Sequence, residues 1–336
     1  MNTGTSPELI EVDCPLCSSG QSSHLFTTKD YLFAISDHQF GIRKCTDCGC
    51  GFLSPRPTQA DIGRYYPEAF YWAWEGAEGK LPWEEIIRRR ERQLSAKKVW
   101  LDGMTPGKLL DVGAQKGEFL WFMQRAGWDV QGVEMDSKVP NPGGMPIHYG
   151  DFLAMDFGDE KFDAITLWAV LEHVYNPALF IEKASSLLKP GGKLVVLVTN
   201  LQSIQARYYQ ADDYPRHLTL FTRKSIALLC RRHHFLVDKV VTDQKIFGGT
   251  LNGGLLYGVK RLFGYPQSEA LREWKQLEDP DLFWCKWRGK PSTIVRIVSK
   301  LDRLFSYPVE QLLDRLGFGF IITFSATRSP VESRNV

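Results

Sequence analysis

One stretch, residues 108–134, constrains the fold of this chain more than any other. A short apolar run at 109–112 predicts a buried parallel strand. Gly113 and Gly117 then open a helix, and a second strand ends at Glu134. A strand, a glycine-containing turn, a helix and a parallel strand form the unit from which open α/β sheets are built, with the ligand at the carboxyl ends of the strands. We therefore expect an α/β fold with a ligand near this turn.

Further apolar runs continue the alternation of strands and helices. They predict strands at 146–149, 161–168, 193–198, 235–241 and 318–326. With the first two, these make a Rossmann-like sheet of seven strands. The first strand carries an acid, Asp111, where the pyrophosphate of a dinucleotide would be repelled, whereas the positive charges of S-adenosylmethionine would be attracted. Glu134, 23 residues later, is placed to accept hydrogen bonds from ribose hydroxyls.

Four cysteines near the N-terminus have the spacing of metal ligands. Cys14 and Cys17 form one CxxC pair, and Cys45 and Cys48 form a second, 27 residues further on. Two such pairs predict a closed four-thiolate zinc site of the structural kind, although the spacer exceeds the commoner 15 to 20 residues. Segments rich in strand-forming residues at 23–28 and 38–44 predict a hairpin between the pairs. Cys50, two residues beyond the second pair, is a competing ligand.

Composition excludes several classes of protein. The chain has 336 residues, with 41 basic and 39 acidic side chains, so it carries no general positive field for nucleic acid. Its polar, acidic N-terminal segment is unlike a signal peptide, and no apolar run reaches the roughly 20 residues of a membrane-spanning helix. We expect a cytoplasmic protein.

The motifs taken together resemble the class I S-adenosylmethionine-dependent methyltransferases, and among these the bacterial group with an N-terminal CxxC…CxxCG zinc ribbon. The motifs that carry the resemblance are LLDVGAQKGEFL at 109–120, Glu134, GD at 150–151, FDAITLWAVLEHV at 162–174, LLKPGGKLVVLV at 187–198 and DYPRHLTLFT at 213–222. The resemblance covers roughly residues 10–240, with the final strand recoverable near 318–327.

The resemblance implies a set of residues that contact the cofactor. Asp111, Gly113 and Gly117 would line its methionine portion, Glu134 would bind the ribose, and Asp151 with Phe152 would meet the adenine. The sequence departs from the family pattern twice. Gln115 replaces a small residue and would narrow the site unless its side chain points away or hydrogen-bonds the cofactor. Ala169 replaces a frequent histidine, which removes a polar group from the cleft.

Two histidines are candidates for a catalytic base. His217 follows the fifth strand in the segment 213–218, at the sheet edge where ligands bind. His173 follows the fourth strand at the same edge. The predicted function is methyl transfer to oxygen or carbon of a small-molecule, sugar, glycan or lipid-linked acceptor. An RNA methyltransferase whose ribbon grips RNA, and a partner protein without activity, are the alternatives.

The expected organisation has four parts: a zinc ribbon and aromatic connector at 1–80, the cofactor domain at 81–241, a helical insertion or lid at 242–317, and a final strand and tail at 318–336. Apolar residues recur at helical spacing over 294–305, so this segment would pack on the core or touch a membrane surface.

Overall fold

The computed structural model describes residues 8–30, 35–66, 81–203, 206–207, 213–243, 246, 304, 308–309 and 311–330. Two predicted features lie largely outside these residues. One is the aromatic connector beyond residue 66, and the other is most of the insertion at 242–317, including the proposed membrane-contacting segment apart from Leu304. Among the described residues, no helix has both the length and the apolar character needed to cross a bilayer.

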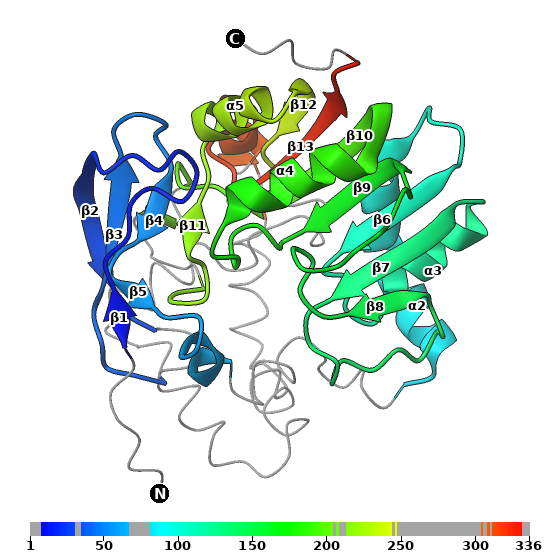
Figure 1. Ribbon diagram of the computed structural model, residues 1–336, viewed down its shortest axis with the longest axis horizontal. Coiled ribbons are helices and arrows are strands. Elements are labelled where there is room, and N and C mark those ends of the chain that lie inside the picture. Colours follow the sequence, from blue (N-terminus) through cyan, green and yellow to red (C-terminus); the bar gives the residue numbers. More distant parts are fainter. Residues whose placement is uncertain are drawn as a thin grey trace, which may run out of the picture.

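A seven-stranded sheet forms the centre of the molecule, as predicted (Figure 1). Its strands are β6 (Lys108–Val112), β7 (Asp129–Glu134), β8 (Ile147–Tyr149), β9 (Phe162–Trp168), β10 (Leu188–Thr199), β12 (Phe235–Val241) and β13 (Ile321–Arg328). They lie in the order β12-β13-β10-β9-β6-β7-β8, and β13 alone runs antiparallel to both of its neighbours. Strands β7 and β8 lie on one side of β6, and the later strands lie on its other side. The glycine turn after β6 therefore lies beside the carboxyl ends of its two parallel neighbours, β7 and β9.

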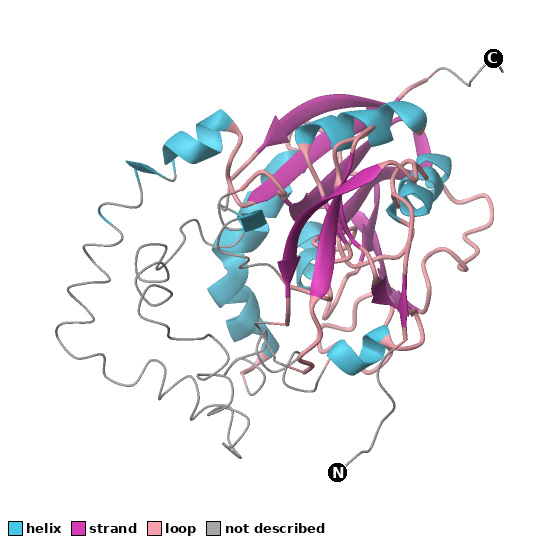
Figure 2. Cartoon of the chain, turned by 90° about the vertical axis from the view of Figure 1, so that its left-hand side faces the viewer, coloured by secondary structure: helices cyan, strands magenta, loops and turns pink. Residues whose placement is uncertain are grey.

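Helices cover both faces of this sheet (Figure 2). On one face α2 (Trp83–Lys98) and α3 (Glu118–Arg125) pack against Leu109, Ala164 and Val195. On the other face α4 (Pro177–Leu187) and α5 (Arg223–Arg232) pack against alternate residues of the same strands. Side chains along a strand point alternately to opposite faces, and apolar residues at nearly every position therefore supply two cores. A short 3-10 turn, η3 (Val99–Leu101), follows α2.

The N-terminal ribbon is built on a second, four-stranded sheet. The predicted hairpin is confirmed as β2 (Ser22–Thr28) paired antiparallel with β3 (Phe40–Cys45), and β4 (Gly51–Leu53) continues the sheet. The fourth strand, β11 (Thr219–Leu220), comes from far along the chain, directly after His217. A separate two-stranded sheet joins β1 (Leu9–Ile10) to β5 (Arg56–Pro57), and η1 (Ile62–Tyr65) follows.

The ribbon and the central sheet share one hydrophobic core. Cys14, Cys48 and Phe52 of the ribbon belong to the same buried cluster as Phe221 and Leu229. Helix α5 also hydrogen-bonds the ribbon at both of its ends. Near its start the Lys224 ammonium donates to the carbonyl of Asp47, and at its end the Arg232 guanidinium donates to the carbonyl of Leu16. The two CxxC turns are therefore seated against the central domain.

Candidate functional site

The turn after β6 has the shape that the sequence predicted. Gly113 and Gly117 both have positive φ, at 76° and 83°, where residues with a Cβ are strained. A Cβ on Gly113 would also lie 2.5 Å from Cγ2 of Val170, and one on Gly117 would lie 2.9 Å from Cγ of Met145. The backbone of the turn therefore needs glycine at both positions for space as well as for conformation.

Glu134 lies at the end of β7, next to this turn. One of its carboxylate oxygens accepts a hydrogen bond from the backbone N–H of Gln115 at 2.9 Å, and the other accepts one from the N–H of Asp136 at 3.3 Å. These bonds hold the half-buried carboxylate at the carboxyl edge of the sheet, beside the glycine turn. Each of its oxygens has further lone pairs that can accept hydrogen bonds from a ligand.

The departure at Gln115 is accommodated by the backbone. Gln115 has a φ of 48°, and its side chain is exposed to solvent while its amide binds Glu134. Ala169 also has a positive φ, of 59°, and its amide donates to the carbonyl of Leu197 at 3.0 Å. Both residues take part in shaping the sheet edge through their backbone.

Asp111 is buried in β6, with 2% of its surface exposed. Its carboxylate accepts a hydrogen bond from the Thr166 hydroxyl at 2.5 Å. Burial raises the pKa of Asp111 to about 7, although nearby Lys97 and the Thr166 hydrogen bond oppose this rise. The site thus contains a carboxyl group whose charge is finely balanced near neutral pH.

The predicted adenine-binding pair lies in the loop after β8. Asp151 is half-buried, and its carboxylate accepts the backbone N–H of Leu153 at 2.9 Å. Phe152 is turned into the core, where its ring lies 5.3 Å from that of Phe180 and 6.3 Å from that of Phe157. The loop is therefore anchored by Phe152, and Asp151 stands at its surface.

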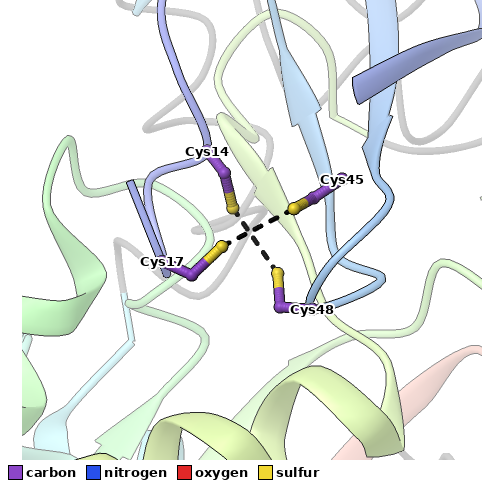
Figure 3. Close-up of side chains that lie close together, drawn as sticks. All are labelled: Cys14, Cys17, Cys45 and Cys48. Carbon is purple, nitrogen blue, oxygen red and sulfur yellow. Dashed lines mark hydrogen bonds between the residues drawn. The ribbon is translucent and has the colours of Figure 1, made fainter. Parts of the chain in front are cut away.

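The four predicted zinc ligands converge on one point (Figure 3). The sulfur of Cys14 lies 3.5 Å from that of Cys48, and the sulfur of Cys17 lies 3.6 Å from that of Cys45. A tetrahedral zinc with Zn–S bonds of about 2.3 Å would separate its sulfurs by about 3.8 Å, so the arrangement fits this ion. Ser18 and Gly49, the residues after the two pairs, have positive φ values of 58° and 78° and turn the chain back sharply.

Cys50 lies beside the cluster and outside the four. Its sulfur is 3.3 Å from that of Cys14, and its side chain is completely buried. Hydrogen bonds with Cys14 and Cys48, together with burial, raise the pKa of the Cys50 thiol. A protonated Cys50 would donate its S–H toward the sulfur of Cys14 and support that ligand.

The two candidate histidines lie against each other. The rings of His173 and His217 pack edge to face with their centres 4.5 Å apart. The hydroxyl of Tyr66 lies 3.2 Å from Nδ1 of His173. Burial, the neighbouring His217 and the Arg216 guanidinium hold the pKa of His173 well below its usual value. His173 is therefore neutral at pH 7. The structure brings the two histidines together, as expected for residues that follow neighbouring strands at one edge of the sheet.

Tyr66 and Glu172 join this group without having been singled out from the sequence. One carboxylate oxygen of Glu172, one ring nitrogen of His173 and one of His217 lie within 4.8 Å of one another. Three such groups could hold a metal ion, and Nδ1 of His173 contacts the Tyr66 hydroxyl, which leaves Nε2 as the ring nitrogen of His173 open to a ligand. The backbone carbonyl of Glu172 accepts hydrogen bonds from the amides of Leu218 and Thr219, which ties the ends of the two loops together.

Arg216 is the buried hub that fixes the His217 loop. Its guanidinium is fully buried and donates to Asp213 at 2.5 Å, to Asp30 of the ribbon at 3.1 Å and to the backbone carbonyl of Tyr65 at 2.8 Å. Burial disfavours the charge, but Asp213 and Asp30 outweigh it, so that the pKa of Arg216 is raised. Arg216 therefore binds three segments of the protein together.

Comparison with known proteins identifies the central part of the chain. A family model described as a methyltransferase domain matches residues 84–240. Two relatives are named ubiquinone biosynthesis O-methyltransferase. That of Actinobacillus pleuropneumoniae is 34% identical over 113 residues, covering 30% of this chain and 48% of the relative. That of Paracidovorax citrulli is 31% identical over 156 residues, covering 39% and 66%. The chain thus spans about half the length of the first of these relatives.

The similarity to one solved structure covers more of the chain, at lower sequence identity. The S-adenosylmethionine-dependent methyltransferase of Archaeoglobus fulgidus is 15% identical, with a TM-score of 0.45, over 77% of this chain and 99% of that one.

Proposed function

We propose that the chain, whose residues 84–240 match a methyltransferase domain, is a class I S-adenosylmethionine-dependent methyltransferase and transfers the methyl group of this cofactor to a small-molecule acceptor. The observation that carries the proposal is the combination of the glycine turn, the rim carboxylate of Glu134 and the histidine pair at the same edge of one sheet. The first two suit a cationic adenosyl ligand, and the third suits an acceptor whose proton must be removed.

The residues around the turn fit S-adenosylmethionine by their donor set. Gly113 and Gly117, which both have positive φ, would let the backbone of the turn approach the cofactor, and Glu134 would accept hydrogen bonds from two neighbouring ribose hydroxyls. Asp111 would supply negative charge for its amino-acid portion. When bound, the cofactor supplies a methyl group on a positively charged sulfur. The contribution of these residues is to hold it in place and in one orientation.

His217 is the residue to which we assign the proton transfer. It is 8% exposed and lies between Arg216, which fixes its loop, and His173, which is neutral. A base of this kind needs a defined position relative to the acceptor, and the Arg216 hub provides it. His173, oriented by Tyr66, would support the His217 ring or bind the acceptor.

The relatives' name favours oxygen as the methylated atom. Both relatives are named O-methyltransferases of ubiquinone biosynthesis, and their similarity lies in the region that holds the cofactor. A hydroxyl group has a high pKa and benefits from a base, which agrees with the assignment of His217. We therefore propose a hydroxylated small molecule as the acceptor. The four cysteines fit a structural zinc ion, which would hold the ribbon without taking part in the chemistry.

The test is transfer of a labelled methyl group from S-adenosylmethionine to a panel of acceptors. The panel contains phenols, sugar nucleotides, lipid-linked sugars and RNA, with a reaction that lacks the protein as the blank. Label in a hydroxylated small molecule supports the proposal. Label in RNA alone, or binding of the cofactor without transfer to any acceptor, would overturn it in favour of one of the two alternatives.

A further inference from the structure

Lys97, in the last turn of α2, directs its ammonium group into the protein. The side chain is half-buried. Its Nζ lies over the ring of Trp168, 5.2 Å from the centre, and over that of Phe119, at 5.7 Å. These two rings pack edge to face at 5.4 Å. Lysine usually extends its ammonium group into water. Here the fold instead holds the ammonium against two aromatic rings, where cation–π attraction stabilises it.

The same face of the sheet carries Asp111. Asp111 and Thr166 are paired across β6 and β9, and Trp168 lies two residues further along β9. Since alternate residues of a strand share a face, Thr166 and Trp168 both point toward α2 and α3. The carboxylate of Asp111 accepts the Thr166 hydroxyl and so lies on that face too. Lys97 and Asp111 therefore approach each other from the helix and from the sheet.

The other charges around Asp111 do not favour its ionised form. Glu134 and Glu118 both act to raise its pKa, and Lys97 is the cation that acts to lower it. Arg90, on the same helix as Lys97, pairs with Glu118 at 3.0 Å. Lys97 itself faces Asp111, Glu118 and Arg90, and burial lowers its pKa. Within the described residues, Lys97 is thus the counter-charge of Asp111.

We propose that Lys97 is a positioning residue of the cofactor site, whose ammonium holds a share of Asp111 in the ionised form at neutral pH while the site is empty. The proposal rests on the proposed function, because the ligand it serves is S-adenosylmethionine. A carboxylate can balance the ammonium of the cofactor, whereas a protonated carboxyl cannot. Even with Lys97 present, the pKa of Asp111 is about 7, so the loss of Lys97 would leave Asp111 protonated at neutral pH.

The experiment is titration of S-adenosylmethionine into Lys97→Met between about pH 6 and pH 9. Wild-type affinity should fall only as the pH drops below about 7, because binding requires the carboxylate and the proton competes with it. In Lys97→Met the fall should begin at higher pH, so that affinity at neutral pH is about tenfold lower than that of the wild type, and the difference between the two proteins should shrink toward about pH 8, above which the cofactor's own α-amino group loses its proton in both. Lys97→Arg keeps the charge and should behave as the wild type.

Lys98→Met is the matched control, because Lys98 lies in the same turn and pairs with Asp102 at the surface. It should bind the cofactor as the wild type does. Equal weakening of Lys97→Met at every pH would assign Lys97 a packing role and overturn the proposal. Unchanged or tighter binding would overturn it as well, since the ammonium would then be idle or would repel the cofactor. A wild type that does not bind S-adenosylmethionine at all would instead overturn the proposed function.

Discussion

The two halves of the candidate site are built in different ways. On the cofactor side the contacts are local, as in the hydrogen bond from Gln115 to Glu134, 19 residues apart. On the histidine side the partners are remote: Arg216 and Asp30 are 186 residues apart, and Tyr66 and His173 are 107 apart. The first half depends on backbone turns within one domain, and the second depends on the ribbon being in place. Binding of the cofactor and catalysis should therefore respond to different changes.

Loss of a zinc ligand should have the largest effect, because the ribbon shares its core with the central sheet. We expect Cys14→Ser to lose the metal and to lower the melting temperature sharply, since the binding energy of a structural zinc is part of the folding energy. Elemental analysis should find about one zinc ion per wild-type chain. Cys50→Ser, beside the cluster, should keep the metal. If Cys14→Ser keeps zinc and stability while Cys50→Ser loses both, the assigned ligand set is wrong.

His217→Ala should lower kcat by about 100-fold or more and leave the affinity for S-adenosylmethionine nearly unchanged. The reason is that His217 is assigned to proton removal from the acceptor and not to binding of the cofactor. Turnover is measured with saturating cofactor, so that titration of Asp111 does not contribute. His24→Ala, an exposed histidine of β2, is the control and should be silent. An unchanged kcat together with an inactive His173→Ala would move the assignment to His173.

Glu134→Ala should have the opposite signature. We expect weaker binding of S-adenosylmethionine by about 1 to 3 kcal/mol, the scale of charge-assisted hydrogen bonds, with kcat at saturation little changed. Calorimetric titration measures the affinity directly. Asp136→Ala serves as the control, because only the backbone amide of Asp136 contacts Glu134. Wild-type affinity in Glu134→Ala would mean that the cofactor lies elsewhere.

The cofactor half could be predicted from the sequence because its signals are local. The order of short apolar strands, the two glycines and the acid at the end of β7 lie within one βαβ unit, and the structure places them as expected. Gln115 is instructive, because its identity suggested a narrowed site. Its positive φ turns the side chain to solvent, a conformation that a non-glycine residue rarely adopts and that sequence patterns do not reveal.

The histidine half could be predicted only in part. The positions of His173 and His217 followed from the ends of their strands, but their partners did not. Strand β11 has two residues, too few for a periodic pattern, and its pairing with β4 joins segments far apart in the sequence. Arg216 is the clearest case: arginine is usually exposed, and although Asp213 is a neighbour in the sequence, only the folded chain brings Asp30 to Arg216 in the interior.

Asp30→Asn tests most directly whether the ribbon positions His217, the proposed base, without contributing to cofactor binding. This nearly isosteric change removes the ribbon's charge from Arg216, and Asp37→Asn, at an exposed position nearby, is its control. We predict a single-turnover rate lowered by about tenfold, with the affinity for S-adenosylmethionine and the zinc content as in the wild type. An unchanged rate, or a rate and a cofactor affinity that fall together, would contradict it.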